Sequence, residues 1–260
     1  MDILTVKSRH FLTRKRGCLD LYLEMSNATT TPPPSSSVGD YVKAIWELGG
    51  GTGTASTKEI ADRLSVAPAS VTNMLGRLRE RGFVEYERYR GASLTEEGRL
   101  EALRLVRRHR LIETFLLEHL GYSWEDVHEE AERLEHAVSD NFTERLAEML
   151  EHPERDPHGE PIPKVDGSLA PDDSRPLVDT EAGERVLISR VSHGVGGDDA
   201  PILVYLGERG LVPGRELVVG EVRALDGVVV VEDEDGVSHA LGPALAASIF
   251  VRTYAESAQE

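Results

Sequence analysis

The sequence predicts a mainly α-helical protein with a small β-barrel domain at its C-terminus. Between residues 38 and 150 apolar residues recur at helical spacing. From residue 184, short valine-rich segments alternate with turns such as Pro213-Gly214 and Asp235-Gly236. Of the 260 residues, 40% are hydrophobic, which is enough to form the cores of two or three small domains.

The first 37 residues are predicted to be a disordered leader. Residues 1–24 are basic, whereas the chain after Met25 is acidic and begins with a tract rich in Thr, Pro and Ser. We expect Met25 to be the true start, the alternative being a real disordered arm. The only cysteine, Cys18, allows no intramolecular disulfide. Neither a secretory signal nor an apolar run near the roughly 20 residues of a membrane span is recognisable, so we expect a cytoplasmic protein without a membrane partner.

Residues 38–96 have the element order of a winged helix-turn-helix domain. A helix is predicted from Asp40 to Gly49, and a second begins at Ser56, where Glu59 completes a capping box. A third helix begins at Pro68 and ends near Gly82, and residues 83–94 alternate around a glycine as a hairpin does. In such a domain the third helix enters the major groove of DNA.

The third helix and the hairpin carry the candidate DNA contacts. Their outward-facing residues are Ala67, Pro68, Ser70, Thr72, Asn73 and Arg77 on the helix, and Arg88 and Arg90 on the hairpin. Among these, Asn73 can make bidentate contacts to adenine. Winged helices also serve protein–protein contacts. Between Val66 and Ala92, however, five arginines outnumber three glutamates, and this local positive charge favours DNA.

The chain as a whole is strongly acidic, with a formal net charge of -17 at pH 7. One interpretation is that no nucleic acid is involved. The other is an acidic surface that keeps the protein soluble in salt. After Met25 the only lysines are Lys43, Lys58 and Lys164, and a composition rich in Asp and Glu but poor in Lys resembles proteins of salt-accumulating archaea. We therefore favour the second interpretation and expect a halophilic archaeon as the source.

Residues 97–165 are predicted to form a helical domain that binds metal. Helices are predicted at 95–120 and 124–150, separated at Gly121, and each carries histidine and glutamate on one face at i, i+4 spacing. These candidate ligands are His109 and Glu113 on the first helix, and His128, Glu132, Glu135 and His136 on the second. The alternative is a solvated acidic face. Imidazoles and carboxylates without a thiolate favour Mn²⁺ or Fe²⁺.

A metal-dependent hydrolase is the rival use of these ligands. The zinc-protease signature His-Glu-x-x-His is not completed, because Glu132 stands where the second histidine is required. We therefore expect no enzyme. A hydrolase or a metal-storage protein that uses its winged helix only to dimerise remains the alternative.

The C-terminal third is predicted to be a linker followed by a barrel. Residues 166–183 are rich in Pro, Asp and Gly, as linkers are. Residues 184–255 are expected to form the barrel, with one helix near Pro201 to Arg209.

Three motifs follow the winged helix in a recognisable order. They are His109-Arg110-Leu111-Ile112-Glu113, then Val127-His128-Glu129-Glu130-Ala131-Glu132-Arg133-Leu134-Glu135-His136, then Asp156-Pro157-His158-Gly159-Glu160-Pro161-Ile162-Pro163. From Asp40 to Pro163 the chain resembles the diphtheria toxin repressor and manganese transport regulator (DtxR/MntR) family of metal-dependent transcriptional repressors. Residues 206–214 resemble the SH3-like (FeoA-like) domain that many members carry.

The resemblance implies a homodimer that binds palindromic double-stranded operator DNA when Mn²⁺ or Fe²⁺ is present, and so controls genes of metal-ion homeostasis. It implies two metal sites: a primary site of Asp40, Glu132, Glu135 and His136, and an ancillary site of His109, Glu113 and His128. An activator is the alternative within regulators.

Four positions depart from one or other branch of the family. Iron-sensing members have cysteine and methionine where this chain has Glu132 and Asp40, which moves the primary site toward the manganese regulators. Manganese regulators often carry a carboxylate where this chain has Lys43, which argues against a paired-metal site. In the barrel stretch that holds ligands in iron sensors, only His193 could coordinate. The physiological metal and the operator sequence stay open.

Overall fold

The computed structural model describes residues 36–87, 90–192, 200–223 and 225–254. Within the predicted leader, only Ser36 and Ser37 are among them. The expectations for Met25, Cys18, Arg88 and His193 lie outside the described residues.

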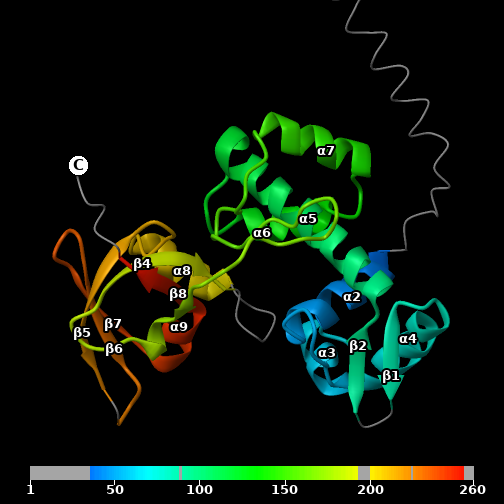
Figure 1. Ribbon diagram of the computed structural model, residues 1–260, viewed down its shortest axis with the longest axis horizontal. Helices are drawn as coiled ribbons and strands as arrows, with labels where there is room; N and C mark the ends of the chain where they lie inside the picture. The colour runs from blue at the N-terminus through cyan, green and yellow to red at the C-terminus, as the bar shows by residue number, and fades with distance from the viewer. Residues whose placement is uncertain (1–35, 88–89, 193–199, 224, 255–260) are drawn as a thin grey trace, which may run out of the picture. The chain divides into compact units, whose positions relative to one another are not determined.

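The winged helix-turn-helix order is confirmed. Its elements, coloured blue to cyan in Figure 1, are α2 (Ser36–Leu48), α3 (Thr57–Arg63), α4 (Pro68–Glu80), β1 (Val84–Glu87) and β2 (Gly91–Leu94). The strands pair antiparallel with Val84 opposite Leu94. The predicted capping box is present, because the Ser56 hydroxyl accepts from the Glu59 backbone N–H and the Glu59 carboxylate accepts from that of Ser56.

The first helix begins earlier than predicted, at Ser36 rather than Asp40. Val38 is buried together with Val42 and Ile45, so the apolar stripe that holds this helix against the domain core extends one turn further back. Asp40 therefore lies in the second turn of α2.

The central domain is built on the long helix α5 (Glu96–Leu120), as predicted. Thr95 caps its first turn, and Gly121 ends it with a left-handed φ of 71°. The single helix expected at 124–150 is wrong: the chain forms α6 (Val127–Leu134) and α7 (Asp140–Met149). Ser139 starts a new helix by accepting a hydrogen bond from the backbone N–H of Phe142, so Glu135 and His136 lie in a turn after α6.

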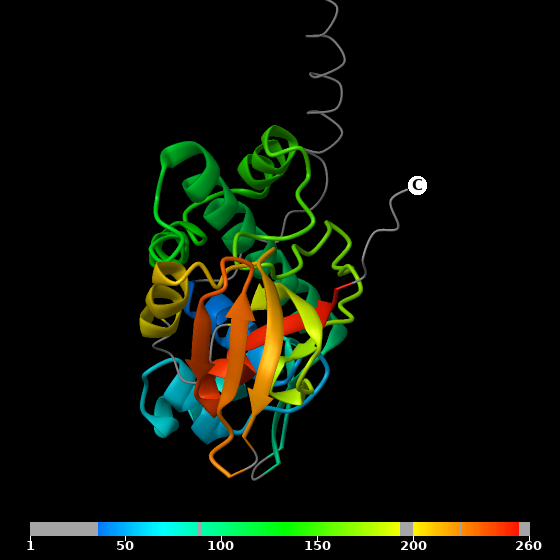
Figure 2. The ribbon, with the colours of Figure 1, turned by 90° about the vertical axis from the view of Figure 1, so that its left-hand side faces the viewer.

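The C-terminal domain is one antiparallel sheet of the order β3-β8-β4-β5-β6-β7, whose strands face the viewer in Figure 2. The strands are β3 (Arg175–Pro176), β4 (Arg185–Val191), β5 (Glu216–Val222), β6 (Val229–Asp233), β7 (Ser238–Leu241) and β8 (Ile249–Thr253). Three short helices join them: η1 (Leu177–Asp179), α8 (Ala200–Glu208) and α9 (Pro243–Ser248). α8 matches the predicted helix, whereas α9 was not predicted.

Part of the expected linker belongs to this sheet, because β3 pairs with β8 and Leu177 of η1 is fully buried in the barrel core. A strand of two residues that contains a proline gives almost no alternation, which hides it from a periodicity argument. Among the described residues, no helix is long and apolar enough to cross a membrane.

Candidate metal centre and DNA-binding face

Asp40, Glu135 and His136 meet where the winged-helix domain contacts the central domain. The Nε2 atom of His136 lies 2.6 Å from Oδ1 of Asp40 and 3.5 Å from Oε1 of Glu135. One ligand atom from each of the three lies within 4.8 Å of the others. Gly39 permits this approach, because a Cβ at Gly39 would lie 3.3 Å from Cε1 of His136 and 3.1 Å from Leu105.

His109, His128 and Glu132 form a second cluster beside the first. The Nε2 atom of His109 lies 3.0 Å from Nδ1 of His128, and both nitrogens lie within 3.0 Å of Oε1 of Glu113. The predicted i, i+4 relation between His109 and Glu113 on α5 therefore places both side chains in one buried site. Glu132 groups here rather than with Asp40, to which the resemblance assigned it.

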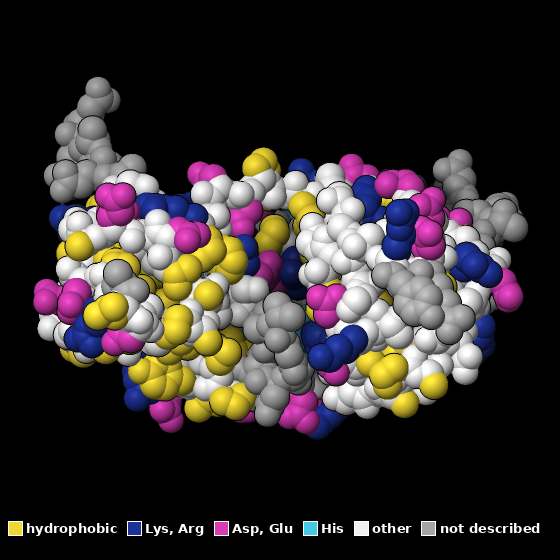
Figure 3. Space-filling model, turned by 90° about the horizontal axis from the view of Figure 1, so that it is seen from below, with side chains coloured by type: hydrophobic (Ala, Val, Ile, Leu, Met, Phe, Trp, Pro, Cys, Tyr) yellow, Lys and Arg dark blue, Asp and Glu magenta, His cyan; other side chains and the backbone are white. Residues whose placement is uncertain are grey.

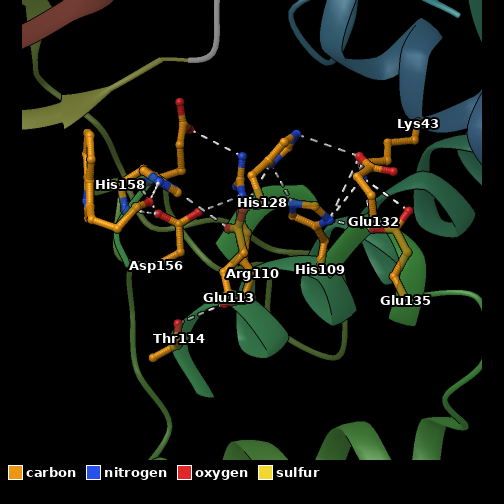
Figure 4. A network of polar contacts seen from close by, with 12 residues as sticks. Lys43, His109, Arg110, Glu113, Thr114, His128, Glu132, Glu135, Asp156 and His158 are labelled. Atoms are coloured by element: carbon orange, nitrogen blue, oxygen red, sulfur yellow. Dashed lines mark hydrogen bonds and ion pairs between the residues drawn. The ribbon is translucent and has the colours of Figure 1, made fainter. Parts of the chain in front are cut away.

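Lys43 contacts one carboxylate of each cluster, and Figure 4 shows it beside Glu132 and Glu135. Its Nζ donates to Oε1 of Glu132 at 2.7 Å and to Oε2 of Glu135 at 2.9 Å, and lies 3.3 Å from Nδ1 of His109. The same Nδ1 is 2.6 Å from Oε2 of Glu135. A buried cation therefore joins the side chains that the two clusters offer to a metal.

A third cluster was missed by sequence reasoning: Glu113, Asp156 and His158, all buried. Oδ1 of Asp156 accepts hydrogen bonds from the backbone N–H groups of His158 and Glu160, which fixes the loop after α7. Oε2 of Glu113 is buried without a hydrogen bond among the described residues, 3.9 Å from Nδ1 of His158. The motif from Asp156 to Pro163 was recognised, but nothing in its spacing indicated that it folds back onto α5.

The charges in these clusters are strongly coupled. Burial and the charge of Lys43 lower the pKa of His109, but the Glu113 and Glu135 carboxylates outweigh them and raise it to about 9. Burial raises the pKa of Glu132, but the charges of Lys43 and His109 lower it to about 2. The hydrogen bond that the His136 ring donates to the Asp40 carboxylate raises the pKa of His136. The Glu132 carboxylate is thus ionised at neutral pH, whereas a metal at His109 must displace a proton.

The three clusters fit a divalent cation of intermediate hardness. Each offers imidazole nitrogen and carboxylate oxygen, and none offers a thiolate, which suits Mn²⁺ or Fe²⁺. The buried oxygen of Glu113 that accepts no hydrogen bond is the kind of atom that a bound cation satisfies. A cleft of about 460 Å³, lined by Lys43, His109, Glu113 and His128 among others, adjoins the clusters.

The candidate DNA contacts form one exposed face of the winged helix. Val71, Leu75 and Leu78 of α4 are buried in the domain core, so the opposite face of the helix points outward. The exposed residues include Ala67, which precedes α4, then Pro68, Ser70, Thr72, Asn73 and Arg77 of α4, together with Arg90 at the hairpin. On the face of the molecule drawn in Figure 3, Lys and Arg side chains are interspersed with Asp and Glu side chains.

Three family profiles match the chain in order. "Iron dependent repressor, N-terminal DNA binding domain" covers residues 35–92, "Iron dependent repressor, metal binding and dimerisation domain" covers 95–164, and "FeoA domain" covers 175–253. The sequence is therefore similar to this family over all three folded domains.

Curated relatives point the same way. The iron-dependent repressor IdeR of Mycobacterium tuberculosis (strain ATCC 25618 / H37Rv) is 32% identical over 200 residues, which cover 74% of this chain and 86% of the relative. The HTH-type transcriptional regulator MntR of Lysinibacillus sphaericus (strain C3-41) is 38% identical over 124 residues, which cover 48% of this chain and 88% of the relative.

Solved structures extend the similarity to 84–88% of the chain. A manganese-dependent transcriptional repressor in complex with manganese superposes with a TM-score of 0.75 at 36% identity, covering 84% of this chain and all of that one. IdeR of T. acidophilum gives a TM-score of 0.69 at 29% identity, covering 88% of this chain and all of that one.

Proposed function

Because the chain belongs to the family of iron-dependent and manganese-dependent repressors, we propose that it represses transcription by binding operator DNA when Mn²⁺ or Fe²⁺ is bound. Like its relatives, it binds double-stranded DNA as a homodimer, and the genes that it controls serve metal-ion homeostasis. The finer assignment of ligands and of DNA contacts is our own proposal.

The contact between Asp40 and His136 carries the proposal. Asp40 belongs to the first helix of the winged-helix domain, whereas Glu135 and His136 follow α6 of the central domain. When bound, a divalent cation supplies a strong electrostatic link among these three side chains. Asp40 then holds α2 against the central domain, and with it the orientation of α4.

The ligands that we propose form two sites. Asp40, Glu135 and His136 make the site that links the domains, and His109, Glu113 and His128 make the second, with Glu132 placed between them beside Lys43. Compared with the assignment from the resemblance, Glu132 moves from the first site to the second, because its carboxylate lies 3.9 Å from His109 and 4.0 Å from His128.

The exposed face of α4 is proposed to read the operator. Asn73 is placed to contact adenine, Arg77 and Arg90 to contact phosphate, and Ala67, Pro68, Ser70 and Thr72 to complete the contacts. A two-fold dimer sets the two recognition helices about one turn of DNA apart.

We further propose that the protein acts in the cytoplasm of a halophile and has no hydrolase activity. The family is one of transcriptional regulators, and its DNA target lies in the cytoplasm. The net charge of -17 and the scarcity of lysine support adaptation to high salt.

The proposal is tested by fluorescence anisotropy of chelator-treated protein on labelled genomic promoter fragments at high salt. Mn²⁺ and, under anaerobic conditions, Fe²⁺ are titrated separately. We expect sequence-specific binding only in the presence of metal, and the ion active at the lower free concentration is assigned as the effector. Specific binding that is insensitive to chelator would overturn the metal switch, whereas metal-dependent hydrolysis without DNA binding would support the alternative.

A further inference from the structure

Lys43 has surroundings that are unusual for a buried lysine. It lies on α2 three residues after Asp40, and only 6% of its surface is exposed. Its ammonium group contacts two carboxylates and an imidazole: Glu132 at 2.7 Å, Glu135 at 2.9 and 3.1 Å, and His109 at 3.3 Å. Every side chain within hydrogen-bonding distance of this cation is thus one that could ligate a metal.

The ammonium group of Lys43 lies where the two clusters adjoin. Glu135 belongs to the cluster with Asp40 and His136, whereas Glu132 belongs to the cluster with His109 and His128. Lys43 contacts one carboxylate of each. A carboxylate shared by two metal ions is the usual bridge in paired-metal sites, and Glu135, with both oxygens on Lys43, is the candidate bridge here.

The ammonium group is paired with a carboxylate of each cluster. Its Nζ lies 2.7 Å from Oε1 of Glu132 and 2.9 Å from Oε2 of Glu135, and the Glu135 side chain is fully buried. A divalent ion placed between the same carboxylates would have to displace a charged group that is already paired there, and it would be repelled by that charge at short range.

We propose that Lys43 is a built-in monovalent cation that occupies the place between the two clusters, so that Glu132 and Glu135 cannot bridge a pair of divalent ions. The proposal rests on the metal sites of the proposed function and specifies their stoichiometry. The ion held by Asp40, Glu135 and His136 then shares no carboxylate with an ion in the neighbouring cluster, and Lys43 determines how many ions the protein takes.

The test compares metal stoichiometry in Lys43→Met, Lys43→Arg and wild-type protein, with Lys164→Met as a matched control at an exposed lysine. Mn²⁺ bound per dimer is measured by equilibrium dialysis with elemental analysis, and electron paramagnetic resonance reports whether bound Mn²⁺ ions are exchange-coupled. We expect one additional Mn²⁺ per chain in Lys43→Met, with the spectrum of a coupled pair. Lys43→Arg, which keeps the charge, and Lys164→Met should match wild type.

A double variant locates the added ion. Glu135→Gln removes the candidate bridge, so Lys43→Met/Glu135→Gln should bind no more Mn²⁺ than Glu135→Gln alone. A gain that persists in the double variant would place the added ion elsewhere and overturn the proposal.

Two further results would overturn it. One is unchanged stoichiometry in Lys43→Met that is folded by circular dichroism. The other is a coupled Mn²⁺ pair in wild-type protein, a measurement that needs no variant to fold. This test does not depend on DNA binding. A gain of one ion in Lys43→Met without metal-dependent operator binding would support the role of Lys43 and reject the repressor mechanism. Metal-dependent operator binding without a gained ion would reject only the role of Lys43.

Discussion

Replacement of Asp40 by asparagine is the most direct test of how metal controls the DNA-binding domain. Among the described residues, Asp40 is the only member of the three metal clusters that comes from the winged-helix domain, and its Oδ1 is 2.6 Å from Nε2 of His136. Asparagine keeps the size of the side chain and removes its charge. Because Asp40 is partly exposed, the new amide can be solvated, so we expect the fold to persist.

The size of the effect follows from the loss of one charged contact. A contact to a charged group contributes roughly 1.5–3 kcal/mol, so the Mn²⁺ concentration for half-maximal operator binding should rise about 10- to 150-fold in Asp40→Asn. The charge of Asp40 also raises the pKa of His136, so its removal weakens proton competition and acts in the opposite direction. At pH 8 this opposing effect is smaller.

The assay is anisotropy of a labelled promoter fragment at pH 8 and high salt, with direct Mn²⁺ binding measured in parallel by equilibrium dialysis. Asp62→Asn, an exposed carboxylate of α3 in the same domain, is the matched control. If both variants respond to Mn²⁺ as wild type does, Asp40 is not the link between metal and DNA. If Asp40→Asn loses Mn²⁺ affinity but keeps its operator response at saturating Mn²⁺, Asp40 is a ligand without a role in coupling.

Three other predictions concern DNA recognition, packing and pH. Asn73→Ala should weaken specific operator binding by about 1–3 kcal/mol and leave non-specific binding unchanged in the same anisotropy assay; an equal loss of both would assign Asn73 to the DNA backbone. Gly39→Ala introduces a Cβ 3.3 Å from His136 and 3.1 Å from Leu105. It should therefore lower the free energy of unfolding in urea by about 1–3 kcal/mol and weaken Mn²⁺ binding in dialysis. Mn²⁺ affinity equal to wild type would show that α2 moves to accommodate the added methyl group. The pKa of His109 is about 9 in the folded protein and about 6.5 in the unfolded chain. Protonated His109 therefore stabilises the fold by an amount on the order of 3 kcal/mol below pH 6.5, and this stabilisation is lost as the pH rises to 9. Urea unfolding of chelator-treated protein at pH 7 and pH 9 should show the decrease, and a His109→Gln variant should not.

The parts of the fold that were predictable depend on local signals. The capping box at Ser56, the proline that begins α4 and the glycine that ends α5 each act within one or two turns, and each was found where the sequence indicated. The pairing of His109 with Glu113 was predictable for the same reason, because an i, i+4 relation on one helix fixes their proximity.

The features that were missed depend on competition or on distance along the chain. An apolar and acidic periodicity continues through residues 124–150, so only the capping preference of Ser139 marks the break between α6 and α7, and a single serine is a weak signal. Asp156 and His158 reach Glu113 across more than forty residues, a contact that periodicity does not address. Glu132 was expected beside Asp40, but its contacts with Lys43 and its proximity to His128 place it in the neighbouring cluster.

Lys43 and Asp40, two charged side chains of α2 that contact the central domain, have different roles in the proposed switch. Lys43 joins α2 to Glu132 and Glu135 through protein atoms alone, so this attachment needs no ion. Asp40 contributes an oxygen that a cation can hold, one helical turn away on the same helix. Under the proposed ligand assignment, metal would strengthen a contact between the domains that Lys43 already forms, and only the part of its binding energy that depends on Asp40 would favour the DNA-binding arrangement. Coupling of 1–3 kcal/mol, typical of allosteric proteins, would correspond to a change in operator affinity of roughly 5- to 150-fold, and by reciprocity operator DNA would tighten metal binding by the same factor.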